Sequence, residues 1–182
     1  GSSLISTNGK MIFEYWHGLD LPPNLPIPKL FAEALIKSTK RLAKFGFSAS
    51  SVTFYFEDQS WIKSQLYAGE WPNVSAILDR KCAANPLPPD FFKGLAAVAP
   101  FSPDGLIHFG QGVMTSHETG DIGASYELGG LPPGLIFSAK QLNLIKPYVE
   151  IVDFTAPGPH EGTTCLMFFG KNIRGVIGGI QK

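Results

Sequence analysis

The sequence has few cysteines, no excess of charge of one sign and no long apolar run. Cys82 and Cys165 are its only cysteines and form no CxxC pair, so we expect free thiols, as in a cytoplasmic protein. Fifteen basic and 15 acidic residues cancel. A nucleic-acid role would therefore have to rest on local clusters of charge. No apolar run approaches the ~18 residues of a membrane span, so no membrane partner is expected.

The sequence also lacks a recognisable catalytic or metal-binding motif. The residues that could be imagined as a metal or acid–base site are His17, His108, His117, His160, Glu118, Asp121 and Asp153. Their spacing matches no ligand motif, because His117 and Glu118 are adjacent rather than arranged as HExxH. Gly129-Gly130 and Gly178-Gly179 do not form a phosphate-binding loop. We expect no catalytic activity, no metal and no cofactor; a small metal- or histidine-dependent enzyme is the alternative.

The residues that are abundant indicate a folded domain of short elements. Hydrophobic residues make up 44% of the chain, and 20 glycines and 15 prolines provide many turns. Periodicity predicts helices over residues 29–45, 89–99 and 138–145, with Gly46 ending the first and Ser138 capping the third. Strand-like segments follow each helix. This repeat of a helix and strands predicts an α+β fold with helices on one face of antiparallel sheets.

The expected strands are short and separated by turns. Asn8-Gly9 predicts a hairpin within residues 4–16. Other strands are expected at residues 51–57, 61–67, 106–109, 112–116, 123–128, 150–154, 163–169 and 174–180.

Basic residues gather on the predicted helices. On the first, Glu33 is the one acid on a face that also holds Lys37, Lys40, Arg41 and Lys44. The other two helices carry Lys93, Lys140 and Lys146. Such a face could contact DNA phosphates without reading sequence. The alternative is an ordinary solvated helix face.

Several short strings resemble the bacterial DNA polymerase III beta-subunit family, the DNA sliding clamps. Residues 7–12 are similar to the T-D-G-H-R-L string of the family's middle domain. Residues 69–78 resemble the G-x-F-P-D/N-x-x-x-V/I-L linker, residues 137–142 the F-N-x-x-Y-L start of the last helix, and residues 176–182 the C-terminal tail. The sequence departs from these strings at Lys10 and Met11, at Gln141 and at Gly178-Gly179.

This resemblance implies a DNA-clamp fold, with residues 1–79 as the second half of the middle domain and residues 80–182 as the complete C-terminal domain. It implies a processivity factor of a bacterial or phage replisome that tethers the replicative polymerase to duplex DNA. The polymerase and clamp loader would bind through short linear peptides, and the full-length protein would be a homodimer. Because residues 1–79 would be half a domain, two copies could pair through them. A clamp-like decoy that binds replisome partners without encircling DNA is the alternative.

The resemblance also assigns residues to two surfaces. The DNA-facing residues are Lys37, Lys40, Arg41, Lys44, Lys93, Lys140 and Lys146. The partner-peptide pocket comprises Thr7, Gly9, Lys10, Met11, Ile12, Pro72, Ala76, Ile77, Ser138, Gln141, Val176, Ile177, Gly178, Gly179 and Ile180. Ile12 and Val176 could equally belong to the core, whereas Ile180 is expected to be exposed to a partner.

Overall fold

A computed structural model describes residues 2–22, 25–119 and 122–180. Contacts divide the chain into two compact units, which are described separately: the small unit, Asp20–Pro72, and the large unit, residues 2–19 and 73–180. No helix within the described ranges is long and apolar enough to cross a membrane.

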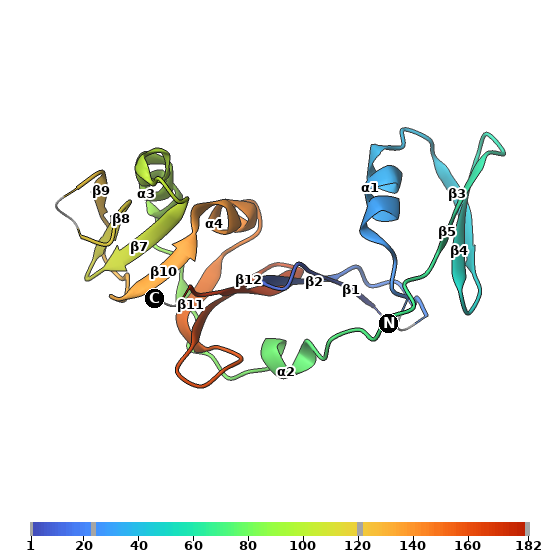
Figure 1. Ribbon diagram of the computed structural model, residues 1–182. Helices are drawn as coiled ribbons and strands as arrows, with labels where there is room; N and C mark the ends of the chain where they lie inside the picture. The colour runs from blue at the N-terminus through green and yellow to red at the C-terminus, as the bar shows by residue number, and fades with distance from the viewer. Residues whose placement is uncertain (1, 23–24, 120–121, 181–182) are drawn as a thin grey trace. The chain divides into compact units, whose positions relative to one another are not determined.

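The large unit contains two antiparallel sheets (Figure 1). The six-stranded sheet has the order β1-β2-β13-β12-β11-β6, with bounds Ser3–Thr7 (β1), Met11–Trp16 (β2), Ile173–Gly178 (β13), Thr164–Gly170 (β12), Ile151–Pro157 (β11) and Asn85–Pro86 (β6). The four-stranded sheet has the order β10-β7-β8-β9, with bounds Leu135–Ser138, Leu106–Gly110, Val113–Thr115 and Ser125–Glu127. Because β2 pairs with β13, the six-stranded sheet extends across the expected boundary at residue 79. The assignment of residues 1–79 and 80–182 to clamp domains remains a prediction.

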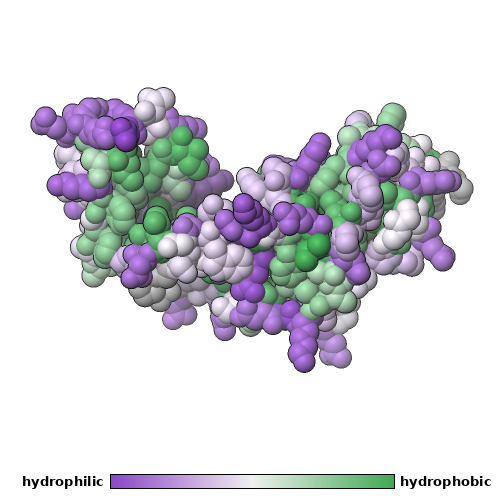
Figure 2. Space-filling view, turned by 180° about the vertical axis from the view of Figure 1, so that it is seen from behind, coloured by the Kyte–Doolittle hydropathy of each residue, from purple (hydrophilic) through white to green (hydrophobic). Residues whose placement is uncertain are grey.

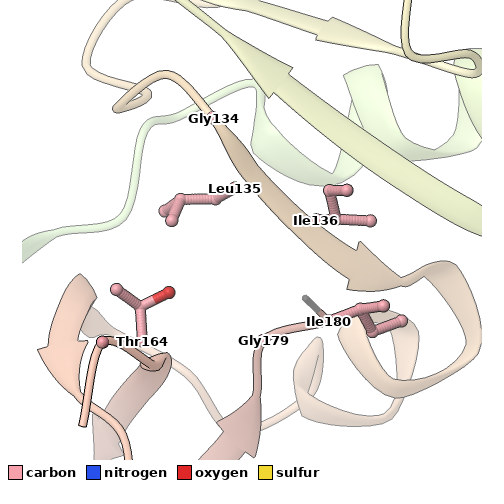
Figure 3. A pocket seen from close by; sticks show the side chains of 7 residues that line it. Gly134, Leu135, Ile136, Thr164, Gly179 and Ile180 are labelled. Atoms are coloured by element: carbon pink, nitrogen blue, oxygen red, sulfur yellow. The ribbon is translucent and has the colours of Figure 1, made fainter. Parts of the chain in front are cut away.

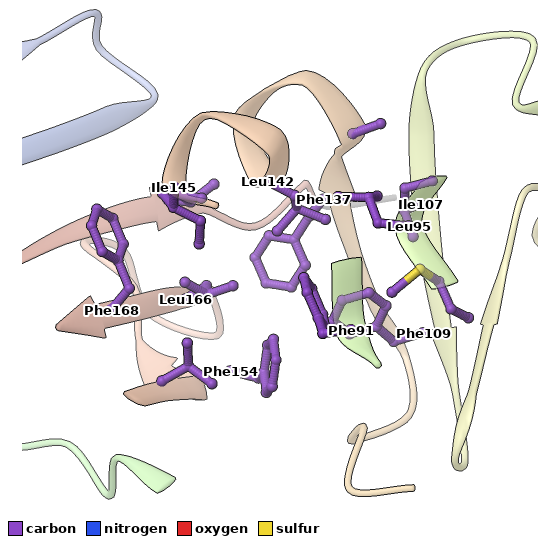
Figure 4. Close-up of a cluster of buried hydrophobic side chains, with 14 of the residues drawn as sticks. Phe91, Leu95, Ile107, Phe109, Phe137, Leu142, Ile145, Phe154, Leu166 and Phe168 are labelled. Carbon is purple, nitrogen blue, oxygen red and sulfur yellow. The ribbon is translucent and has the colours of Figure 1, made fainter. Parts of the chain in front are cut away.

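Two helices, α3 (Phe91–Val98) and α4 (Ala139–Ile145), contact each other and contribute to the main core. Phe91, Leu95, Leu142 and Ile145 are fully buried there, and Phe109 and Phe154 pack edge to face. Figure 4 shows these side chains converging from both sheets and both helices. A 3₁₀ turn, Ala99–Phe101, follows α3. The expected helices at residues 89–99 and 138–145 are therefore confirmed, although the side chain of Ser138 makes no capping hydrogen bond.

A short helix, α2 (Ser75–Leu78), contacts β13 of the six-stranded sheet. Its Leu78 packs with Ile12, Met167 and Val176 in a second, smaller core. Neighbouring residues on the strands, such as Met11 and Ile177, belong instead to the main core. This alternation follows from the two-residue period of a strand, and it shows that both faces of the sheet are covered.

The small unit contains α1 (Lys29–Lys37) and a three-stranded antiparallel sheet, β3-β4-β5. The strands run over Leu42–Phe47, Ser51–Phe56 and Trp61–Gln65. Phe54 of β4 lies 5.6 Å from Phe31 of α1 and 5.8 Å from Phe45 of β3, measured between ring centroids.

The prediction of one helix over residues 29–45 is wrong, because the helix ends at Lys37 and residues 42–47 form β3. Ser38 is extended, with φ −70° and ψ 127°, and its hydroxyl accepts the N–H of Lys40 at 3.3 Å. Phe45 and Phe47 follow the alternate spacing of a strand and pair with Phe54 and Val52. Gly46 lies within this strand rather than ending a helix. Strand pairing outweighed a helical pattern that several apolar residues also fit.

The remaining strands lie close to their expected positions, including the β1–β2 hairpin at Asn8-Gly9. Strands β6 and β10 were not expected. The predicted repeat is nevertheless present, because α1, α3 and α4 are each followed by antiparallel strands. The α+β architecture is confirmed.

Candidate partner-peptide pocket and basic helices

The hairpin turn at residues 7–11 is held by its own side chains. The Asn8 side-chain oxygen accepts the N–H groups of Lys10 (3.0 Å) and Met11 (2.9 Å). The Thr7 hydroxyl accepts the N–H of Gly9 at 3.1 Å. Gly9 has φ +83°, a conformation that costs a residue with a side chain about 1 kcal/mol or more. Thr7, Gly9 and Lys10 are thereby fixed in exposed positions.

The end of the described chain, residues 178–180, runs from the six-stranded sheet to the four-stranded sheet. Gly178 N–H donates to Lys10 O at 2.8 Å, and Gly179 N–H donates to Thr164 O at 3.1 Å. Ile180 N–H then donates to Ile136 O of β10 at 2.9 Å. Three successive residues therefore bond to three different segments, which fixes the path of this tail.

A cavity of about 540 Å³ opens beside the tail (Figure 3). Its lining is Gly134, Leu135, Ile136, Gly162, Thr164, Gly179 and Ile180. The lining combines the apolar side chains of Leu135 and Ile180 with Thr164 and with the backbone of the three glycines. Such a mixture of apolar side chains and accessible backbone suits a short peptide. We call this cavity the tail pocket.

Gly179 and Ile180 are the two predicted pocket residues that line the tail pocket. Ile180 is 37% exposed, as expected. The sequence did not predict the other five lining residues, Gly134, Leu135, Ile136, Gly162 and Thr164. The apolar run Leu135-Ile136-Phe137 after Gly134 is a strand signal that could have revealed the β10 residues.

Several other predicted pocket residues are buried within the large unit. Met11 and Ile177 belong to the main core, and Ile12 and Val176 to the second core, where Ile77 packs against them. For Ile12 and Val176 the structure supports the core alternative. Gln141 is buried in α4 and Ser138 half-buried at the end of β10, while Ala76 is exposed on α2. Pro72 belongs to the small unit.

Arg174 of β13 connects the tail strand to the hairpin and to α2. Its Nε lies 2.7 Å from Glu14 Oε2, and a terminal nitrogen lies 2.9 Å from Asp79 Oδ1. It also donates to Leu78 O at 3.1 Å. Burial lowers the pKa of Arg174, but hydrogen bonds to Glu14 and Asp79 raise it more, so its pKa lies above the ordinary value. The sequence alone did not predict this structural role of Arg174.

The predicted DNA-facing residues of the large unit lie on α3 and α4 or directly after α4. Lys93 and Lys140 are exposed, and the Lys146 ammonium lies 5.9 Å from the centroid of the Phe92 ring. Neither helix contains an acidic residue. The two helices themselves therefore carry only positive charge, while the acidic Asp90 directly precedes α3.

In the small unit, the predicted basic helix face is not formed. Lys37 is exposed on α1, but Lys40, Arg41 and Lys44 lie beyond the end of the helix. The Lys40 ammonium lies 2.8 Å from Asp58 Oδ2, and this contact is the main reason why the pKa of Asp58 falls to about 2. Arg41 pairs with Glu57 at 3.3 Å, and Lys44 lies over the Tyr55 ring at 5.3 Å.

The residues considered for an enzyme are dispersed. Among the described residues no group of three metal-ligand side chains comes together, and Asp121 lies outside those residues. His17 and His160 lie in loops, His108 in β7 and His117 after β8, where its Nδ1 is 2.9 Å from the Ser116 hydroxyl. Asp153 is 7% exposed and accepts bonds from Ala83 N–H (2.7 Å), Thr155 N–H (2.8 Å) and the Thr155 hydroxyl (2.9 Å). The Asp153 carboxylate therefore fixes the backbone at Ala83 and Thr155.

No protein-family model and no curated protein matches the sequence. Solved structures do match. The chain resembles the DNA polymerase sliding clamp of Caulobacter crescentus, with a TM-score of 0.72, 19% identity, and coverage of 98% of this chain and 53% of that one. It is similar to the sliding clamp of Pseudomonas aeruginosa, with a TM-score of 0.70, 12% identity, and coverage of 100% and 56%. The chain is also similar to the griselimycin-bound sliding clamp of Bartonella birtlesii, with a TM-score of 0.69 and 14% identity. The match covers 99% of this chain and 54% of that one.

The fold defined by these elements is that of the bacterial DNA polymerase III beta sliding clamps. The chain spans about half the length of the solved clamps that it matches. TM-scores of 0.69–0.72 establish the fold, and identities of 12–19% show no more than the fold.

Proposed function

We propose that this chain is part of a DNA sliding clamp that tethers a replicative polymerase to duplex DNA and has no catalytic activity. The tail pocket would bind short peptides of the polymerase and the clamp loader. The observation that carries the proposal is a cavity of about 540 Å³ beside a tail that is anchored at residues 178–180 in a chain with the clamp fold.

The pocket has the chemistry that this role needs. Ile180 and Leu135 provide an apolar surface for an aliphatic side chain, and the glycines leave room for peptide backbone. A solved relative of this fold is bound to griselimycin. The exposed lysines of α3 and α4 would contact phosphates independently of sequence.

The first test is a titration with a labelled peptide that carries the clamp-binding segment of the cognate polymerase. Saturable binding is expected, and Ile180→Asp should weaken it at least tenfold, because a carboxylate would have to be desolvated in the apolar wall. Ile122→Asp is the matched control, since Ile122 is 62% exposed and does not line the pocket.

Two outcomes would count against the pocket. If the wild-type chain does not bind the peptide, the tail pocket is not the partner site. Equal weakening by Ile180→Asp and Ile122→Asp would show that the effect is not local.

A further inference from the structure

Both cysteines of the chain belong to the second core of the large unit. Cys165 of β12 is fully buried there, and Cys82 packs against the same cluster. Cys82 lies in residues 79–84, which join α2 to β6 and which we call the connector. Hydrophobicity alone does not bury a side chain in this protein, since hydrophobic side chains are also visible at the surface (Figure 2). Specific contacts therefore bring two cysteines that are far apart in sequence into one small cluster.

The side chain of Cys165 lies on the face of the six-stranded sheet that carries the second core. Cys165 and Met167 belong to this core, whereas Leu166 between them belongs to the main core. Cys165 pairs with Ala156 of β11, which is also part of the second core. The Cys165 thiol donates to Pro157 O at 3.4 Å. These contacts fix the thiol against the β11–β12 pair.

The connector is held to β11 on both sides of Cys82. The Arg80 guanidinium donates to Pro157 O at 2.7 Å, and the same carbonyl accepts the buried thiol of β12. The Ala83 N–H donates to Asp153 Oδ2 of β11 at 2.7 Å. Because only residues 81 and 82 separate these two anchors, the connector stays close to β11 between them. Cys82 is thereby held beside the strand pair that carries the other thiol.

The pKa values of the two thiols reflect the same neighbourhood. Burial raises the pKa of Cys165 to about 11; the nearby Arg80 lowers it, and Asp153 and Cys82 raise it further. Burial and Asp153 also raise the pKa of Cys82. The same carboxylate is therefore close to both cysteines. Since Cys82 is half-buried, a small oxidant can reach it, whereas the fully buried Cys165 is shielded from direct attack.

We propose that Cys82 and Cys165 are a redox-sensitive pair that forms a disulfide when the protein meets hydrogen peroxide. The Cys82 thiolate attacks the peroxide, whose O–O bond breaks, and the products are a sulfenic acid on Cys82 and water. The Cys165 sulfur then attacks the sulfenic sulfur, so that the S–S bond forms, the S–O bond breaks and a second water leaves. Together the two thiols give up two electrons and two protons, and the peroxide is reduced to water.

The disulfide fastens the connector covalently to β12, where hydrogen bonds to β11 hold it in the reduced protein. The connector leads from α2 into β6, and β12 also carries Thr164, which lines the tail pocket. A cross-link between residues this far apart in sequence restricts the unfolded chain. The oxidised protein should therefore be more stable than the reduced one.

The experiment treats the whole native chain with hydrogen peroxide, blocks the remaining thiols in denaturant and maps the proteolytic peptides by mass spectrometry. We expect two peptides joined through Cys82 and Cys165 and separated by dithiothreitol. Their formation should be roughly tenfold faster at pH 8 than at pH 7, because the thiolate is the reactive form. Cys165→Ala should stop at a sulfenic acid on Cys82, which dimedone traps. Cys82→Ala should leave Cys165 as a thiol, because that residue is buried.

A comparison of the oxidised and reduced wild-type chains tests the proposal without any substitution. The connector amides should exchange more slowly after oxidation, and the urea midpoint should rise. The amides of β9, an edge strand of the four-stranded sheet, should exchange as before. Two thiols that both survive the peroxide, or that are oxidised separately to sulfinic acids, would overturn the proposal. So would a disulfide found only between two chains, at twice the 19.7 kDa mass.

Discussion

At the scale of single residues, Asp153 shows how one carboxylate organises its surroundings. Burial raises its pKa, but hydrogen bonds from Ala83 and Thr155 lower it more, so the pKa lies below its ordinary value. A carboxyl group whose pKa is depressed on folding stabilises the protein above its unfolded pKa of about 3.9 and loses that contribution as the pH falls through the folded value.

We expect Asp153→Asn to lower the free energy of unfolding by roughly 1–3 kcal/mol at pH 7, because hydrogen bonds to a charged acceptor become bonds to a neutral one. The difference from wild type should shrink below about pH 4. Urea unfolding at pH 7 and pH 3 measures this. Glu161→Gln, at an exposed position in the β11–β12 loop, is the control and should change little. A difference that is the same at both pH values would rule out the charge as its cause.

The cysteines provide a second prediction at this scale. Both are free, and burial raises the pKa of Cys165 to about 11 and that of Cys82 in the same direction. Since the thiolate is the reactive form, a thiol reagent at pH 7.5 should modify the half-buried Cys82 slowly and the buried Cys165 hardly at all. Both should react in denaturant without a reductant. Fewer than two thiols in denaturant would reveal a disulfide.

At the scale of elements, Arg174 holds three segments together: β13, the hairpin strand β2 through Glu14, and α2 through Leu78 and Asp79. The Glu14 side chain is 9% exposed. We expect Arg174→Met to cost roughly 3 kcal/mol, because it leaves a buried carboxylate unpaired. Adding Glu14→Gln should recover part of the loss.

Chemical unfolding of the two variants tests this coupling. Glu33→Gln is a suitable control, because its pair with Lys29 is exposed and 3.6 Å long and should contribute less than about 0.5 kcal/mol. If the double variant is no more stable than Arg174→Met, the Arg174–Glu14 pair is not the reason for the loss.

At the scale of the whole molecule, a neutral chain can still associate with DNA if positive charge is gathered on α3 and α4. We expect weak, sequence-independent binding whose salt dependence decreases when Lys93, Lys140 and Lys146 are changed together to Gln. The slope of log affinity against log salt should fall by at most about 2.7, at 0.9 per phosphate contact. Fluorescence anisotropy with a labelled duplex measures it.

In the matched control, Lys63, Lys81 and Lys171, which are exposed elsewhere on the protein, are changed to Gln. This control alters the net charge by the same amount as the triple variant on the helices. Equal slopes for the two triple variants would show that the helices are not the contact surface. If the chain binds the peptide but no DNA, the result would favour a clamp-like decoy over a clamp that tethers the polymerase to DNA.

Sequence by itself determined the repeat of helix and strands, the hairpin at Asn8-Gly9 and the exposure of Ile180, because these depend on local periodicity, turn chemistry and position near the end of the chain.

The tertiary structure decided where the first helix ends. Residues 42–45 suit a helix and a strand alike, and only pairing with β4 selected the strand. The structure also decided which aliphatic residues line a pocket. Ile177 and Ile180 look equivalent in sequence, but the strand buries Ile177, while the bond from Ile180 N–H to Ile136 O places Ile180 in the pocket wall. Burial and cavities arise from contacts between distant segments, which a linear pattern does not record.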